Sequence, residues 1–107
     1  MGMVLACDLR IAVPGTKVFY PVMKLGFLPQ PSDPARLSAL VGPSRAKMIL
    51  MAGQKIATDS ALTWGLIDEI VEPDALIDRA KALTEDVCGA TAEHARAIKG
   101  LIAQSLP

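Results

Sequence analysis

The 107-residue sequence contains few aromatic side chains, two cysteines and one histidine, and each shortage excludes a class of protein. Aromatic residues make up 4% of the chain and apolar residues 51%, so the core has to be built from Ala, Leu, Ile, Val and Met. Cys7 and Cys88 lie far apart and form no C-x-x-C pair, so neither a disulfide framework nor a metal centre is predicted. We expect both thiols to be buried as small hydrophobic groups.

The chain also lacks an excess of charge and a long hydrophobic run. Eleven basic and eleven acidic side chains cancel, and no basic stripe with interleaved aromatic residues occurs, so nucleic acid is not an expected partner. The apolar runs are far shorter than the roughly 20 residues that span a bilayer, and the start lacks a signal-peptide pattern. We therefore expect a soluble, cytoplasmic protein with no membrane span, and at most one domain at this length.

Proline and glycine divide the first third of the sequence into short segments. Residues 2–7 form an apolar run that would be read as a strand from pattern alone. Residues 9–13 alternate in polarity and stop at Pro14-Gly15, which predicts a strand. Four prolines between residues 21 and 34 predict that residues 21–31 are extended or loop.

The remaining segments are predicted to be helical, apart from a strand around residues 66–71. Asp33 fits a helix N-cap, because Pro34 would then occupy the favoured first helical position. The expected helices run from Asp33 to about Gly42, over 45–52 with Ser44 as the cap, from a Thr58 or Asp59 cap to Gly65, from Pro73 to Gly89, and onward from a Thr91 cap. The last two carry apolar stripes, formed by Leu76, Ala80, Leu83 and Val87 and by Ala95, Ile98, Ile102 and Leu106.

Four motifs follow one another along the chain: ACDLRIA at 6–12, KLG at 24–26 with Pro29, RL at 36–37 before VG at 41–42, and ALTWGLIDEIV at 61–71. In identity, order and spacing they resemble the crotonase superfamily, the enoyl-CoA hydratase/isomerase family, from Met1 to about Gln104. The resemblance implies an α/β fold of the crotonase-like (ClpP/crotonase) type, of which residues 1–107 form the C-terminal portion. It further implies short strands in a core portion over about 1–72, C-terminal helices over about 73–107, a helix at 2–7 and a strand at 17–20.

The resemblance implies chemistry on an acyl-CoA thioester. Family members hold the thioester carbonyl between two backbone N–H groups, an oxyanion hole whose donors are typically worth about 3 kcal/mol each. Counting back from Cys7-Asp8 puts both donors upstream of Met1, so we expect the chain to begin inside the family domain and to be inactive alone. Coenzyme A would be part of the substrate, and no separate cofactor or metal is expected.

The family's two catalytic glutamates, which activate water by general acid/base catalysis, correspond to Gly2 and Val22. A third position, an aspartate in some members, corresponds to Gln30. None of these three side chains can transfer a proton near neutral pH. Asp33 is the nearest carboxylate and could reach the same pocket, although a helix cap is its simpler role.

Three other residues invite a functional and a structural interpretation. Lys99 corresponds to a basic residue near the CoA phosphates in many members, but a lysine on an amphipathic helix is usually solvated. His94, among alanines at the start of the last helix, is expected to be exposed or packed rather than catalytic. Trp64 is expected to be partly buried at a sheet edge or a subunit contact.

Two functions remain open at this point. The first is an acyl-CoA enzyme with a divergent site, belonging to the lyase or isomerase class and to fatty acid metabolism. The second is a non-catalytic module that keeps the fold for oligomerisation or as a scaffold. The family assembles as trimers or pairs of trimers, so the expected partners are further copies of the chain, or the missing N-terminal part of the same protein.

Overall fold

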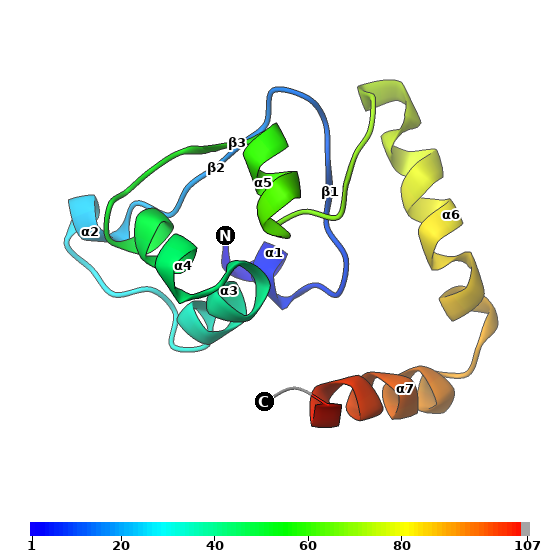
Figure 1. Cartoon of the computed structure of the whole chain (residues 1–107). Helices are drawn as coiled ribbons and strands as arrows, with labels where there is room; N and C mark the ends of the chain where they lie inside the picture. The colour runs from blue at the N-terminus through cyan, green and yellow to red at the C-terminus, as the bar shows by residue number, and fades with distance from the viewer. Residues whose placement is uncertain (106–107) are drawn as a thin grey trace. The chain divides into compact units, whose positions relative to one another are not determined.

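The computed structural model describes residues 1–105, and these form two compact units. The first unit is Met1–Leu76 and the second starts at Ile77. Figure 1 shows the short helices and strands of the first unit and the two long helices, α6 and α7, that follow. Leu106, expected on the apolar stripe of the last helix, lies outside the described residues.

The first unit consists of short helices and two-residue strands (Figure 1). Its elements are α1 (Gly2–Ala6), β1 (Ile11–Ala12), β2 (Lys17–Val18), α2 (Val22–Leu25), α3 (Asp33–Val41), α4 (Pro43–Leu50), β3 (Ile56–Ala57), α5 (Thr58–Trp64), β4 (Glu69–Ile70) and the 3-10 helix η1 (Pro73–Ala75). The helix implied at residues 2–7 by the family resemblance is therefore confirmed, and the strand predicted there from pattern alone is wrong. Residues 21–31 contain one short helix, α2, which the proline-based prediction of a loop missed.

The four strands form two separate two-stranded sheets. β1 lies parallel to β4, with Ile11 opposite Glu69 and Ala12 opposite Ile70. β2 lies antiparallel to β3, with Lys17 opposite Ala57 and Val18 opposite Ile56. The buried Thr58 hydroxyl extends the second pair by donating to the Thr16 carbonyl at 2.6 Å. The pairings thus join segments that lie about 40 to 60 residues apart in sequence.

The core is aliphatic, as the low aromatic content predicts. Leu37, Ile49 and Ala61 are fully buried, on α3, α4 and α5 respectively. Leu5, Val41, Ala46, Ile56, Leu66 and Ile67 complete the buried cluster. Leu5 is the contribution of α1, so that short helix is fixed against α3 by packing rather than by its own length.

Three of the predicted helix caps are wrong. Ala57 is the N-cap of α5, which starts at Thr58, so neither Thr58 nor Asp59 caps that helix. Ser32 rather than Asp33 is the N-cap of α3, and Pro34 is its second residue. Gly42 is the N-cap of α4, which starts at Pro43, so Ser44 lies inside the helix. The glycine stop at Gly65 is confirmed, with φ of +83° in the left-handed region where glycine is favoured.

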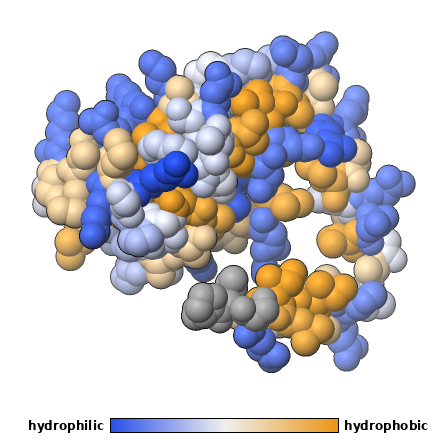
Figure 2. Space-filling model, in the orientation of Figure 1, coloured by the Kyte–Doolittle hydropathy of each residue, from blue (hydrophilic) through white to orange (hydrophobic). Residues whose placement is uncertain are grey.

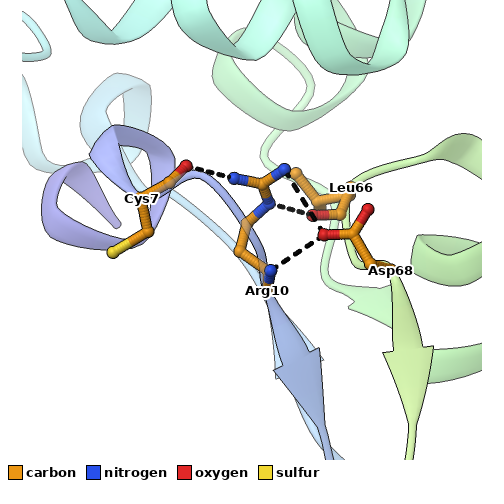
Figure 3. A network of polar contacts seen from close by, with 4 residues as sticks. All are labelled: Cys7, Arg10, Leu66 and Asp68. Atoms are coloured by element: carbon orange, nitrogen blue, oxygen red, sulfur yellow. Dashed lines mark hydrogen bonds and ion pairs between the residues drawn. The ribbon is translucent and has the colours of Figure 1, made fainter. Parts of the chain in front are cut away.

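An arginine clamp fixes the chain between α1 and β1 to the turn before β4 (Figure 3). Arg10 is buried, and its Nε donates to the Leu66 carbonyl at 2.8 Å while Nη1 donates to the Cys7 carbonyl at 2.7 Å. The Arg10 backbone N–H donates to Oδ2 of Asp68 at 2.8 Å, and Nη2 lies 3.8 Å from the same oxygen. Arg10 and Asp68 belong to two of the sequence motifs, ACDLRIA and ALTWGLIDEIV, so the clamp joins those motifs.

The second unit consists of α6, which starts at Leu76 in the first unit and ends at Gly89, and α7 (Ala92–Ser105). The Thr91 cap is confirmed, because its hydroxyl oxygen accepts the backbone N–H of His94 at 3.1 Å. Apolar side chains of both helices are exposed, among them Ile77, Val87, Ile98, Leu101 and Ile102. Figure 2 shows hydrophobic surface over α7.

Candidate functional site at the start of α1 and α3

Gly2 and Asp33, two of the residues considered from sequence, lie together. Each is the first residue of its helix, α1 and α3. A Cβ atom built on Gly2 would stand 3.2 Å from Oδ2 of Asp33 and 3.5 Å from Oδ1. The Asp33 carboxylate therefore lies directly beside the open side of Gly2, and glycine is the residue that leaves it room.

Asp33 is 2% exposed, and its carboxylate has a hydrogen-bond partner inside the protein. The Tyr20 hydroxyl donates to Oδ2 at 2.7 Å. Among residues 1–105, every buried side-chain nitrogen or oxygen has such a partner, as the high cost of an unpaired polar group requires. The prediction that Asp33 caps a helix is wrong, because its side chain pairs with Tyr20 and α3 has no side-chain cap.

Gln30 joins this pair through its main chain. Its backbone N–H donates to the Tyr20 hydroxyl oxygen at 3.4 Å, and its side chain is exposed. The Asp33 carboxylate, which accepts the hydroxyl hydrogen bond, together with partial burial raises the pKa of Tyr20 above 10.0, and the Gln30 N–H opposes this rise. Tyr20 therefore keeps its proton at neutral pH and acts as a donor to Asp33.

Val22 stands apart from the carboxylate. Its backbone N–H donates to the Tyr20 carbonyl at 2.9 Å, but its buried side chain lines an apolar groove of about 450 Å³. That groove is further lined by Met23, Phe27, Leu28, Leu50 and Met51. The structure thus groups Gly2, Gln30 and Asp33 around Tyr20 and places Val22 among hydrophobic side chains.

A second apolar groove, of about 520 Å³, lies along α1 and the strands β1 and β2. Its lining includes Met1, Val4, Leu9, Ile11, Val18 and Phe19. Three of these side chains, Val4, Leu9 and Phe19, are about half exposed. Cys7, Arg10 and Lys17 also line this groove, which is otherwise mainly apolar.

The remaining candidates are distributed over the surface. Lys99 and His94 are exposed on α7, which agrees with the non-catalytic interpretation of the histidine. Trp64 is half-buried and stacks against Arg45, whose guanidinium carbon lies 5.0 Å from the ring centre. Cys7 and Cys88 are both exposed, so the prediction of buried thiols is wrong.

Within residues 1–105, no three His, Cys, Asp or Glu side chains gather closely enough to hold a metal ion. No helix in the same range is both long and apolar enough to cross a membrane.

Sequence reasoning missed Tyr20. It was counted only as the end of a strand, since nothing local marks a tyrosine before Pro21 as functional. The one available signal is its rarity, because it is the only tyrosine in a chain with four aromatic residues. The partly buried Tyr20 hydroxyl finds its partner in Asp33, 13 residues further along the chain.

Comparison with known proteins agrees with this architecture. Residues 1–106 match the family model described as enoyl-CoA hydratase/isomerase. A short-chain-enoyl-CoA hydratase of Clostridioides difficile is 40% identical over 81 residues, which are 76% of this chain and 52% of that protein. A protein of the same name from Clostridium acetobutylicum is 36% identical over 83 residues, covering 78% and 32% of the two chains. The chain thus matches about half or less of the length of these relatives.

Solved structures show the same fold. An enoyl-CoA hydratase/isomerase family protein from Hyphomonas neptunium is 33% identical with a TM-score of 0.81, over 92% of this chain and 38% of the other. Enoyl-CoA hydratase from Mycobacterium tuberculosis is 25% identical with a TM-score of 0.84, over 95% and 46%. The architecture is accordingly the C-terminal portion of the crotonase-like fold, with short strands followed by helices. The chain belongs to the enoyl-CoA hydratase/isomerase family of the crotonase superfamily.

Proposed function

We propose that the protein containing this sequence processes acyl-CoA thioesters, in the lyase or isomerase class, and acts in fatty acid metabolism in the cytoplasm. The observation that carries the proposal is the family match over residues 1–106, with relatives named short-chain-enoyl-CoA hydratase. The thioester would form an enolate, stabilised by an oxyanion hole whose backbone donors lie upstream of Met1. The 107 residues alone would then be inactive.

The acid/base part of the site departs from the family arrangement. Gly2 has no side chain to move a proton, and Val22 is buried among hydrophobic residues. Ordinary hydration by a pair of glutamates therefore cannot occur at these two positions. Coenzyme A enters as part of the substrate in this proposal, with no separate cofactor, and Lys99 on α7 is a candidate contact for its phosphates.

Isothermal titration tests the proposal. A short acyl-CoA and free CoA are titrated into these 107 residues and into the complete protein that contains them. Binding of acyl-CoA by the complete protein, with weaker or no binding by the 107 residues, is the expected result. A complete protein that binds neither ligand would refute the proposed acyl-CoA chemistry.

A second candidate function is assembly without catalysis, and the exposed apolar side chains of the second unit favour it. Ile98, Leu101 and Ile102 on α7 are each about half or more exposed, and a surface of this kind is typical of protein contacts. We propose that copies of the protein form trimers or pairs of trimers through such surfaces, in either function. Light scattering after size-exclusion chromatography measures the oligomeric state of the complete protein and of its Leu101→Glu variant. A trimer that dissociates in the variant supports the assembly, and a wild-type monomer contradicts it.

A further inference from the structure

Charge is unevenly distributed along the chain, although its net charge is zero. Between residues 11 and 58 every basic side chain is exposed, and the one acidic residue, Asp33, is buried. Between residues 59 and 78 the chain has acidic side chains and no basic one. The bases of the first stretch are Lys17, Lys24, Arg36, Arg45, Lys47 and Lys55, and the acids of the second are Asp59, Asp68, Glu69, Glu72, Asp74 and Asp78. The two stretches therefore have opposite charge.

The apolar groove of about 450 Å³ lies in the basic stretch. Its lining comes from residues 22–29, in and after α2, and from Leu50 and Met51 at the end of α4. Lys24 lies inside α2, and Lys47 lies one helical turn before Met51 on the same face of α4. Four lining side chains are more than half exposed: Met23, Phe27, Leu28 and Met51. A group of exposed apolar side chains of this kind marks an interaction site.

The start of α6 has the complementary properties. Ile77 is 63% exposed, and no residue of α6 from Leu76 to Gly89 is buried. Asp74 lies in η1, three residues before Ile77, and Asp78 follows Ile77 directly. An exposed isoleucine between two carboxylates matches, in polarity and in charge, an apolar groove whose two segments each carry a lysine.

One copy cannot make this contact with itself. The groove belongs to the first unit, and so does η1, which leads directly into α6. Figure 1 shows α2 at one side of that unit and the segment before α6 at the other. The contact therefore has to join two copies. A surface that binds a different surface of the next copy produces a ring or a filament.

We propose that the groove between α2 and the end of α4 receives the start of α6 of a second copy. Ile77 of that copy enters the groove, and its two neighbouring carboxylates lie beside Lys24 and Lys47. The inference deepens the proposed assembly by naming the two surfaces that meet, and it rests on that assembly rather than on acyl-CoA chemistry. The apolar contact supplies affinity, and the charges select which surface is bound. Three such contacts close a ring of three copies, the smaller of the assemblies proposed above.

The test measures the dissociation constant of the assembly of the complete protein by analytical ultracentrifugation. Lys24→Glu with Lys47→Glu reverses the charge beside the groove, and Asp74→Lys with Asp78→Lys reverses it on the surface that enters. We expect the dissociation constant to rise about tenfold or more in each double variant, because like charges then face each other. Added salt should weaken the wild-type assembly, since exposed charges are screened.

Three controls complete the design. Lys17→Glu with Lys55→Glu reverses as many charges on exposed lysines outside the groove lining, and it should leave the dissociation constant unchanged. An equimolar mixture of the two charge-reversed proteins should associate, because every groove then meets a segment of opposite charge. Where a charge-reversed variant is unfolded, Ile77→Ser removes the exposed anchor without touching a buried residue and should weaken the assembly as strongly.

The outcomes separate this inference from the proposed assembly. An assembly as stable in the charge-reversed variants as in wild type, or weakened equally in the control, would overturn the inference and leave the proposed assembly standing. Loss of acyl-CoA affinity in the groove variant without loss of assembly would assign the groove to the substrate and overturn the inference as well. A monomeric wild-type protein would overturn both.

Discussion

Arg10 and Asp68 form a reciprocal pair across β1 and β4. The Arg10 backbone N–H donates to Asp68 Oδ2, and the Asp68 backbone N–H donates to the Arg10 carbonyl, each at 2.8 Å. The pair aligns Ile11 with Glu69 in the parallel register and fixes the chain that leaves α1. Arg10 and Asp68 lie 58 residues apart in sequence, and the clamp explains why their two motifs occur together, because each supplies hydrogen-bond partners to the other.

Removing the Asp68 carboxylate should weaken the fold. Asp68→Ala leaves the Arg10 N–H and part of the buried guanidinium without their partner, which should lower the free energy of unfolding by about 1 to 3 kcal/mol. Urea unfolding followed by circular dichroism measures the change. Asp86→Ala, an exposed aspartate on α6, is the control and should stay within about 0.5 kcal/mol. Equal effects of the two substitutions would contradict the role of the clamp.

The aliphatic core should be sensitive to the loss of a single side chain. Leu37 on α3 is fully buried, so Leu37→Ala should cost about 2 to 5 kcal/mol of unfolding free energy through lost burial and the cavity left behind. Leu28 is 88% exposed, and Leu28→Ala should change stability by less than about 0.5 kcal/mol. Thermal unfolding of both variants provides the comparison. A Leu37→Ala protein as stable as wild type would disprove this description of the core.

Gly65 should tolerate alanine less well than Gly26. Both glycines have positive φ, +83° and +78°, so alanine at either site should cost about 1 to 2 kcal/mol in backbone strain. At Gly65 the added Cβ would also meet the Leu40 carbonyl oxygen at 3.1 Å, whereas nothing lies within 4 Å at Gly26. Denaturant unfolding of Gly65→Ala and Gly26→Ala measures the loss of stability at each site, and the difference between the two losses reports the contact with the Leu40 carbonyl oxygen. A smaller loss of stability at Gly65 than at Gly26 would be inconsistent with that contact.

Tyr20 should make stability fall at alkaline pH. Its hydrogen bond to Asp33 raises the folded-state pKa above the unfolded value of about 10, so the folded state holds this proton more tightly. The resulting stabilisation is complete below pH of about 10 and is lost as the pH rises through the folded-state pKa. Unfolding free energies of wild type and Tyr20→Phe, measured from about pH 8 to 11, should converge toward the alkaline end. If the two unfolding free energies stay the same distance apart at every pH, the Tyr20–Asp33 hydrogen bond is not the cause of the loss of stability at alkaline pH.

Local signals in the sequence predicted part of the fold well. Thr91 caps α7 and Gly65 ends α5, because each depends on backbone geometry within a few residues. Asp33 fitted the same local rule equally well and was assigned wrongly. Its carboxylate pairs with Tyr20, a tertiary contact that local spacing does not encode.

The candidate site was foreseeable only in part for the same reason. Counting from the motifs predicted Gly2, Val22 and Gln30 as pocket positions, and named Asp33 as the nearest carboxylate. The packing of α1 on α3 is what brings Asp33 within 3.2 Å of the Gly2 Cβ position, across 31 residues of sequence. The exposure of Cys7 and Cys88 was likewise unpredictable, since it depends on which faces of the helices are covered.

Exchange of the α protons of butyryl-CoA in heavy water, followed by nuclear magnetic resonance, tests the proposed enolate chemistry most directly. Butyryl-CoA has no C=C double bond, so exchange reports only the removal and return of a proton next to the thioester. The complete protein should bind butyryl-CoA and catalyse the exchange. Binding without exchange, or no binding, would contradict the proposed enolate chemistry.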